Sequence, residues 1–350
     1  MRLTGRRSSR RPSTQVSELL GSSDGPLSSA YDVAVLDLDG VVYVGRAAVL
    51  GAPEALNKAQ TGGMHLAFVT NNASRTPAIV GAHLRDLGVE AHDEDVVTSA
   101  QAAARLLAEQ LPAGSTVFLL GGQGLMEALE ERGLRWVTER SDDVAAVVQG
   151  YGPDVDWKQV TSGAVLVRQG LPWVASNTDM TIPTADGVAP GNGALVRLIA
   201  EFAEREPQVA GKPMPPLFEE TLDRVGGERP LLVGDRLDTD IEGAVTVGWD
   251  SLLVLTGVTG LEELVRARPH ERPTYVAPDL AALSEVQEAP EATDSGVRLG
   301  GWTSSISAGR LSVSGDGSEG DWWRVAAVAA WRHLDETGQP VGTDGLQPPG

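Results

Sequence analysis

Short apolar runs alternate with segments of helical periodicity along most of this chain. Residues 32–36 and 65–69 are apolar runs of strand length, and the spacing of apolar positions predicts helices over 52–60 and 77–87. Strands of a parallel sheet are covered on both faces and are joined by helices, so they read as continuous apolar runs. The pattern therefore predicts a parallel α/β sheet in this part of the chain.

The same alternation returns farther along the chain. Strands are expected at 117–120 and 145–148, with a helix at 125–131 between them. Residues 164–167 and 173–175 are weaker strand candidates. This part of the sequence predicts a second α/β unit.

Two later apolar runs, 231–233 and 251–255, read as further strands, and the first ends in a Gly-Asp pair. The simplest architecture is one doubly wound α/β domain built from both ends of the region. The second α/β unit is then inserted between the two halves of that domain.

The two ends of the chain differ in composition from the rest. Residues 1–30 are polar, rich in Arg and Ser and aperiodic, so we expect a disordered tail rather than a transit peptide. Beyond residue 290, the pattern predicts a hairpin over 297–315 and an amphipathic helix over 321–334. We expect this appendage, spanning 295–340, to pack on the core through the tryptophans of its helix, and the last residues to be loose. These tryptophans are Trp322, Trp323 and Trp331.

Charge and composition exclude several classes of function. The chain has 48 acidic and 28 basic residues and a net charge of −20, which argues against a nucleic-acid-binding protein. This charge fits a cytoplasmic protein kept in solution by self-repulsion. No apolar run approaches the roughly 18 residues needed to cross a bilayer, so we expect no membrane insertion. The absence of cysteine excludes disulfides, zinc-thiolate sites and a cysteine nucleophile.

An acidic pair follows the first predicted strand. Asp37 and Asp39 are two residues apart, and ligands of open α/β sheets bind beyond the carboxyl ends of the strands. Paired carboxylates are costly to desolvate unless a cation shares their site. The alternative is an ordinary Asp-rich turn. A calcium loop is excluded because the further oxygen ligands and the late Glu that it needs are missing.

Three further segments have polar residues at a strand end or helix start. Thr70 and Asn71 follow the second strand and suit an anion, although helix capping by Asn72 or Ser74 is the more ordinary interpretation. Lys212 is one of three lysines in an arginine-rich chain, and a compact ammonium suits a phosphate oxygen as well as solvent.

The fourth segment runs from Asp235 to Asp240 and follows another apolar strand. Its carboxylates are ligands of the kind that Mg²⁺ prefers. The alternative interpretation of this segment is an acidic loop that caps the next helix through Thr239 or Asp240.

The order of these four segments resembles the haloacid dehalogenase-like phosphatases. Residues 37–41 match the D-x-D-G-[VT] signature of that family, and the resemblance covers roughly 31–285. The long gap between Thr70 and Lys212 is similar to the NagD-like, 4-nitrophenylphosphatase-like branch, which inserts its cap domain there. An N-x-D…P…G…PG-x-G segment over 177–193 also fits that branch. The resemblance implies a catalytic core over 31–98 and 194–288 and a cap over 99–193.

The resemblance also implies roles for individual residues. Asp37 would be the nucleophile that becomes an aspartyl-phosphate, and Asp39 the general acid and base. Asp37, Asp39 through its backbone carbonyl, and Asp235 would hold Mg²⁺, with Mn²⁺ or Co²⁺ as substitutes, and Asp240 would orient the waters of the metal. The phosphate would be bound by the remaining three residues, Thr70, Asn71 and Lys212.

The substrate is expected to be a small phosphorylated metabolite. Asn177 and Asp179 belong to the cap loop, and Ile182 stands where relatives that act on pyridoxal phosphate tend to present a His. An apolar residue there is more similar to phosphoglycolate and glycerol-phosphate members, and the C-terminal extension is similar to actinobacterial glycerol 3-phosphate phosphatases. The resemblance thus favours glycerol 3-phosphate, with 2-phosphoglycolate and then pyridoxal phosphate as alternatives, in a monomer or homodimer.

Two functions of other classes compete with this one. A signalling receiver domain also uses a phosphorylated Asp, a Thr and a Lys, but its acceptor follows a middle strand and it is far shorter. A dinucleotide-binding module would use the glycines of 121–124, but Glu127 stands where its fingerprint requires Gly or Ala. We therefore interpret 121–124 as a tight turn from strand to helix.

Overall fold

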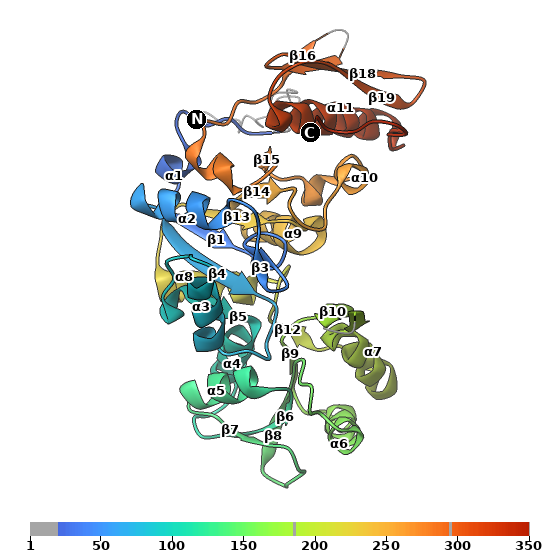
Figure 1. The fold of residues 1–350 in the computed structure, drawn as a ribbon. Coiled ribbons are helices and arrows are strands. Elements are labelled where there is room, and N and C mark those ends of the chain that lie inside the picture. Colours follow the sequence, from blue (N-terminus) through green and yellow to red (C-terminus); the bar gives the residue numbers. More distant parts are fainter. Residues whose placement is uncertain (1–19, 185–186, 294–295, 350) are drawn as a thin grey trace, which may run out of the picture.

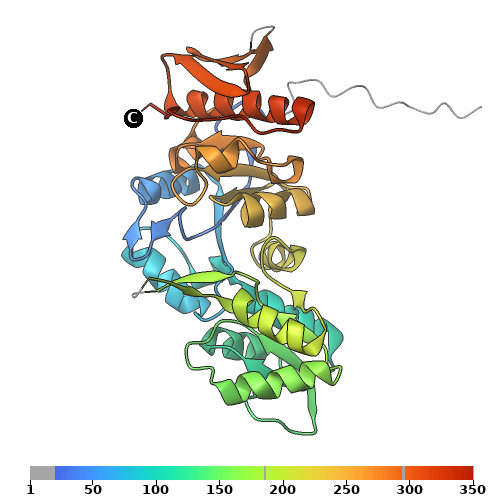
Figure 2. The same ribbon diagram turned by 90° about the vertical axis from the view of Figure 1, so that its right-hand side faces the viewer.

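The computed structural model describes residues 20–184, 187–293 and 296–349 of the 350-residue chain. Three parts follow one another along its length (Figure 1). The appendage lies at one end, the catalytic core in the middle and the inserted cap at the other end, and a quarter-turn of the view preserves this order (Figure 2). The predicted α/β fold with an inserted α/β unit and a small C-terminal appendage is confirmed.

The core contains a six-stranded sheet in the order β15-β14-β13-β1-β4-β5, and all neighbouring strands in it are parallel. Helices cover both faces. The side chains of α2 (Ala52–Thr61) and α3 (Pro77–Asp86) pack on one face, and those of α4 (Ser99–Gln110), α8 (Pro215–Val225) and α9 (Glu242–Val247) pack on the other. The strands are β1 (Val33–Leu36), β4 (His65–Thr70), β5 (Val96–Thr98), β13 (Pro230–Gly234), β14 (Asp250–Val254) and β15 (Tyr275–Ala277).

The cap is a second α/β layer around a five-stranded parallel sheet in the order β12-β9-β8-β6-β7. Its helices α5 (Gln123–Glu131), α6 (Trp157–Arg168) and α7 (Asn192–Ala203) flank that sheet, and the hairpin of β10 (Thr181–Thr184) and β11 (Gly187–Pro190) precedes α7. The strands are β6 (Thr116–Leu120), β7 (Arg135–Val137), β8 (Val144–Gln149), β9 (Trp173–Ala175) and β12 (Gln208–Val209).

Two expectations about the cap are wrong. Residues 164–167 belong to α6 and not to a strand, since a short apolar run fits a buried helix as well as a strand. The cap also continues past residue 193, because Val196, Ile199 and Ala203 of α7 fill its core and β12 pairs with β9. The second half of the catalytic core therefore begins near residue 210 and not at 194.

The glycines at 121–124 lie where the cap meets the core. The backbone N–H of Gly124 donates to the carbonyl of Ser74, and a side chain at 124 would collide with the carbonyls of Ala73 and Arg75. Gly122 packs against Ser74 as well. These glycines allow close packing between two backbones, and they form the expected turn between β6 and α5.

Residues 1–30 were expected to form a disordered tail, and this expectation is wrong for residues 20–30. Residues 1–19 lie outside the described residues, but 20–30 are ordered against the core. Leu20 and Leu27 are buried, Pro26 forms a β-bridge with Val286, and a short helix α1 (Leu27–Ala30) follows. Burial of these two leucines explains why a segment of polar composition is held in place.

The appendage is a four-stranded antiparallel sheet covered on one face by a long helix. The predicted hairpin is present as β18 (Trp302–Ser307) and β19 (Arg310–Gly315), preceded by β16 (Glu291–Thr293) and β17 (Gly296–Leu299). Helix α11 (Glu319–Thr337) buries its tryptophans between this sheet and the core, as expected. The tail beyond it is not loose, because Val341 is buried and Gly342 pairs with Arg310.

Within the described ranges, no helix combines the length and the apolar character that a membrane span requires.

Candidate active site

The site lies at the carboxyl ends of the central strands β1 and β13. Asp37 directly follows β1, and its backbone N–H donates to the carbonyl of Val233 in the neighbouring strand. Asp235 directly follows β13. Parallel pairing of the two strands therefore brings residues almost 200 positions apart to one edge of the sheet.

Lys212 connects two of the carboxylates. Its Nζ lies 2.6 Å from Oδ1 of Asp37 and 2.7 Å from Oδ1 of Asp240, and its side chain is only 3% exposed. Burial opposes the charged form of Lys212, but the carboxylates of Asp240 and Asp37 outweigh it and raise the pKa of the ammonium. Lys212 is therefore a fixed positive charge at the floor of the site.

Asp235 is held by backbone and presents one oxygen without a partner. Its Oδ2 accepts a 2.6 Å hydrogen bond from the backbone N–H of Val258, whereas its buried Oδ1 has no hydrogen-bond partner. Burial and then the charge of Asp37 raise the pKa of Asp235 to about 6. A side chain at Gly257 or Gly40 would collide with this carboxylate, so both positions require glycine.

These carboxylates fit a divalent cation. Oxygens of Asp37, Asp235 and Asp240 lie within 4.8 Å of one another. Burial raises the pKa of Asp240 to about 7, because Lys212 only partly offsets the loss of water. A buried carboxylate oxygen without a hydrogen-bond donor is costly, and a hard cation such as Mg²⁺ would satisfy it. The donor set thus fits the predicted metal.

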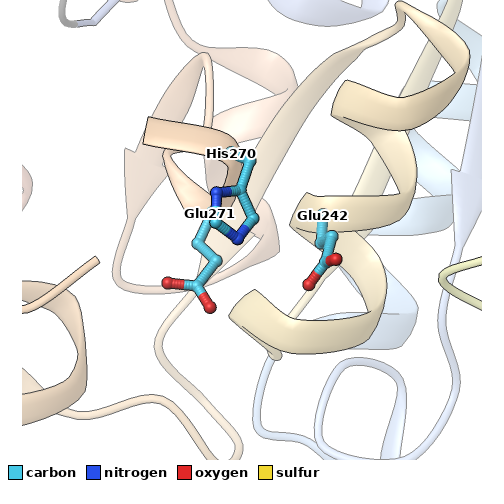
Figure 3. A group of neighbouring side chains, drawn as sticks. All are labelled: Glu242, His270 and Glu271. Carbon is cyan, nitrogen blue, oxygen red and sulfur yellow. The ribbon is translucent and has the colours of Figure 1, made fainter. Parts of the chain in front are cut away.

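Among the described residues, a second group could also hold a metal ion (Figure 3). It consists of Glu242 on α9 and of His270 and Glu271 before β15. The carboxylate of Glu271 is already paired with Arg268, at 2.6 Å, and this pairing lowers its pKa. An arginine thus supplies the positive charge here, and this group is a surface ion-pair cluster.

Asp39 lies at the mouth of the site, two residues beyond Asp37. Its side chain reaches solvent, but the surrounding protein partly removes its water. This desolvation, followed by the charge of Asp37, raises the pKa of Asp39 to about 6. Arg75, for which the sequence offered no signal, acts in the opposite direction and lowers that pKa. A carboxyl with a raised pKa is suited to carry and return a proton.

Thr70 is the last residue of β4, the strand beside β1, and the side chain of the next residue, Asn71, is bound by protein groups. Oδ1 of Asn71 accepts from the backbone N–H of Lys212 at 2.8 Å, and its Nδ2 lies 3.2 Å from both the Lys212 carbonyl and Oδ1 of Asp179. The side-chain amide of Asn71 is therefore occupied by the backbone of Lys212 and by Asp179. These bonds hold the backbone of Lys212 in place, and the phosphate contact of Asn71 stays a prediction.

The alternative that Asn72 or Ser74 caps the next helix is wrong, because another residue is the cap. Helix α3 begins at Pro77, and Thr76 is its cap, with Oγ1 accepting from the N–H of Ile79 at 3.4 Å. Asn72 instead accepts from the backbone N–H of Ser74, and its own N–H donates to Oγ1 of Thr70 at 3.0 Å. The chain between β4 and α3 thus makes a tight turn that leaves Thr70 buried at the site.

The cap loop reaches this point of the core. Nδ2 of Asn177 donates to the carbonyl of Asn71 at 2.6 Å, and burial raises the pKa of Asp179. Ile182 lies farther along, half-buried in the β10–β11 hairpin. Asn177 and Asp179 thus both contact Asn71, whose amide binds the backbone of Lys212.

The comparisons with known proteins agree with this geometry. The sequence model described as haloacid dehalogenase-like hydrolase matches residues 34–135, and the model described as HAD-hydrolase-like matches 209–283. The chain is 41% identical to D-glycerol 3-phosphate phosphatase of Mycobacterium tuberculosis over 84% of its own length and 82% of that protein. The chain belongs to the haloacid dehalogenase-like hydrolases.

Two solved structures extend this result. Glycerol phosphate phosphatase from Mycobacterium tuberculosis in complex with magnesium has a TM-score of 0.79 and 40% identity, covering 88% of this chain and 92% of that one. A p-nitrophenyl phosphatase from Archaeoglobus fulgidus has a TM-score of 0.67 and 29% identity, covering 73% and 98%. The resemblance inferred from the sequence is confirmed for the family and for its NagD-like, 4-nitrophenylphosphatase-like branch.

Proposed function

We propose that this hydrolase is a Mg²⁺-dependent phosphatase that converts glycerol 3-phosphate into glycerol and phosphate. The observation that supports the phosphatase reaction best is the convergence of Asp37, Lys212 and Asp235 at one sheet edge. A nucleophilic carboxylate, a fixed ammonium and a cation-binding carboxylate are what an anionic phosphoryl group requires. The similarity to glycerol 3-phosphate phosphatase supports the choice of substrate.

Asp37, Asp235 and the backbone carbonyl of Asp39 would hold the metal, and Asp240 would orient its waters. The unpartnered Oδ1 of Asp235 supports this assignment. When bound, Mg²⁺ offsets the charge of the carboxylates and of the phosphate, so that a negative nucleophile can approach a negative substrate.

The chain's own residues then carry out two displacements. A carboxylate oxygen of Asp37 attacks phosphorus, the bond to the glycerol oxygen breaks, and an aspartyl-phosphate forms. Lys212 keeps the Asp37 carboxylate oriented and balances charge on the transferred group, as its 2.6 Å contact allows. Thr70 would hold a phosphate oxygen, and its buried hydroxyl supports this role because it accepts one hydrogen bond and still has a proton to donate.

Asp39 handles the proton in both displacements. In the first, it gives its proton to the departing glycerol alkoxide, and in the second it takes a proton from the water that attacks the aspartyl-phosphate. Phosphate leaves and Asp37 is regenerated, so the net reaction consumes one water. A carboxyl with a pKa of about 6 can serve both steps near neutral pH.

The cap supports a small substrate. Its loop hydrogen-bonds to Asn71 of the core through Asn177 and Asp179, so the cap lies against the strand end next to Thr70 and limits the space for a leaving group. We place 2-phosphoglycolate second and pyridoxal phosphate third, since Ile182 has no ring nitrogen or charge to offer a pyridine. The acidic, cysteine-free composition supports a cytoplasmic enzyme, and we expect a monomer or homodimer.

Phosphate release from a panel of small phosphomonoesters in the presence of Mg²⁺ tests the proposal. We expect kcat/KM to be highest for glycerol 3-phosphate and to vanish in Asp37→Asn, whose fold should be intact by circular dichroism. A preference for pyridoxal phosphate or 2-phosphoglycolate would overturn the substrate assignment alone. Full turnover by Asp37→Asn would overturn the mechanism.

A further inference from the structure

The appendage helix contacts the segment that leads to the active site. Nε1 of Trp331, in the middle of α11, donates a 2.7 Å hydrogen bond to the carbonyl of Leu264, the last residue of α10 (Leu261–Leu264). Both partners are fully buried. A buried indole N–H needs an acceptor, so this bond fixes how α11 sits on α10.

Helix α10 continues directly from the loop that holds Asp235. The backbone N–H of Leu264 donates to the carbonyl of Gly260, at the end of the loop 255–260. In that loop, the N–H of Val258 binds Oδ2 of Asp235 at 2.6 Å and the N–H of Thr259 binds its carbonyl at 3.2 Å. The contact with Trp331 at Leu264 is therefore only six positions along the chain from the Val258 amide that orients the Asp235 carboxylate.

The segment that carries Asp240 also shares buried apolar packing with the appendage. Leu237 and Ile241, which flank Asp240, belong to one buried apolar cluster with the tryptophans of α11. The backbone segment that carries Asp240 thus shares one apolar core with the appendage and with α10. Removing well-packed atoms from such a cluster shifts its neighbours, because protein interiors are close-packed.

Arg272 secures the position of Trp331. Its guanidinium lies over the indole ring, 5.4 Å from the centroid, and makes two 2.7 Å hydrogen bonds to the carboxylate of Asp335, also on α11. Its Nε donates to the carbonyl of Ala267, just beyond α10. The Arg272 side chain is 7% exposed and the Asp335 side chain 44%, so the arginine is buried and its bidentate pair with Asp335 reaches solvent only on the carboxylate side.

We propose that the appendage is part of the metal site, in that Trp331 positions the loop 255–260 and thereby the metal-binding oxygen of Asp235. Trp331 touches neither metal nor substrate, so it is a positioning residue. The inference rests on the proposed Mg²⁺ site and is independent of which phosphomonoester is hydrolysed. It gives a role in the reaction to an appendage that is buried against α10 and the edge strand β15.

Trp331→Phe tests this, with Trp323→Phe as the matched control. Both changes delete an indole N–H from a buried residue of the same apolar cluster on α11, but Nε1 of Trp323 donates to Glu319 of the same helix at 3.1 Å, so its loss breaks no hydrogen bond to the core. Mg²⁺ affinity is measured by titration calorimetry on the substrate-free, full-length proteins, and folding by thermal unfolding in EDTA. We expect Trp331→Phe to bind Mg²⁺ about 10-fold more weakly and Trp323→Phe to bind it as wild type does.

Equal Mg²⁺ affinity in wild type and Trp331→Phe overturns the proposal and leaves the appendage a stabilising element only. The proposal also fails if both variants lose affinity in proportion to their loss of thermal stability. Wild type that binds no Mg²⁺ overturns the metal site and this inference together. If the wild-type protein binds Mg²⁺ but does not hydrolyse glycerol 3-phosphate, only the substrate proposal is overturned.

If Trp331→Phe does not fold, Asp335→Asn serves instead, because it loosens Arg272 from Trp331 at a half-exposed position. Its control is Asp344→Asn, which breaks an ion pair to Arg310 within the appendage. Weaker Mg²⁺ binding in Asp335→Asn alone supports the proposal, and unchanged binding in both overturns it.

Discussion

The ammonium of Lys212 donates a 2.6 Å hydrogen bond to Oδ1 of Asp37, although 175 positions separate the two residues in the chain. The same ammonium donates to Asp240 at 2.7 Å, so one cation is shared by two buried carboxylates. Removing it leaves both anions without their partner. The pair is therefore important to folding as well as to the reaction.

Lys212→Met is expected to abolish phosphate release and to lower the free energy of unfolding in EDTA by about 3–5 kcal/mol, the usual cost of leaving a buried charge unpaired. Urea unfolding followed by circular dichroism measures the stability. Lys158→Met is the control, because Lys158 forms an exposed pair with Glu139 and its loss should change neither quantity. A Lys212→Met protein as stable as wild type would contradict the shared-cation arrangement.

Asp39→Asn is expected to slow hydrolysis of glycerol 3-phosphate by about 10²–10⁴-fold, the typical contribution of a general acid. The loss with 4-nitrophenyl phosphate should be much smaller, because its phenolate leaves without a proton. Steady-state kinetics on the two substrates gives the comparison directly. Equal losses on both would count against proton transfer by Asp39.

Asn71→Ala tests the hydrogen bonds that this side chain makes to the backbone of Lys212 and to Asp179. We expect kcat to fall about 10-fold while the KM for substrate changes little, since this amide is bonded to Lys212 and Asp179 and serves to position the lysine. Asn72→Ala is the control, because the Asn72 side chain serves the local turn through Ser74. A large rise in KM with kcat unchanged would show instead that Asn71 binds the phosphate.

The proximity of Asp37 and Asp235 could be predicted from the sequence because the carboxyl ends of parallel strands lie at the same edge of a sheet. Val33–Leu36 and Pro230–Gly234 are apolar throughout, so they pair in the middle of the sheet, and Asp37 and Asp235 must follow at the same edge. The bonds of Asn71 could not be predicted in this way. Its partner is the backbone of a residue 141 positions away, and backbone groups leave no signature in a sequence.

The loop 255–260 was missed for a related reason. It orients Asp235 through the N–H of Val258, which any residue but proline could supply. The loop's one residue that has to be of a particular type is Gly257, where a side chain would collide with the Asp235 carboxylate. In a chain with 41 glycines, this glycine does not stand out in the sequence. The C-terminal limit of the cap was missed because α7 and β12 read equally well as part of either α/β unit.

Asp235→Asn separates metal binding from folding. In the metal-free protein, the buried Asp235 carboxylate faces the charge of Asp37, and burial with that charge raises its pKa to about 6. A neutral amide removes this repulsion, so we expect the Tm of the variant in EDTA to equal or exceed that of wild type.

Mg²⁺ should raise the Tm of wild type and leave that of Asp235→Asn unchanged, because a protein is stabilised only by what its folded state binds. Differential scanning fluorimetry with EDTA and with Mg²⁺ measures all four values, and Asp238→Asn, at an exposed neighbour paired with Arg236, is the control. A Mg²⁺ shift of wild-type size in Asp235→Asn would remove this residue from the metal site.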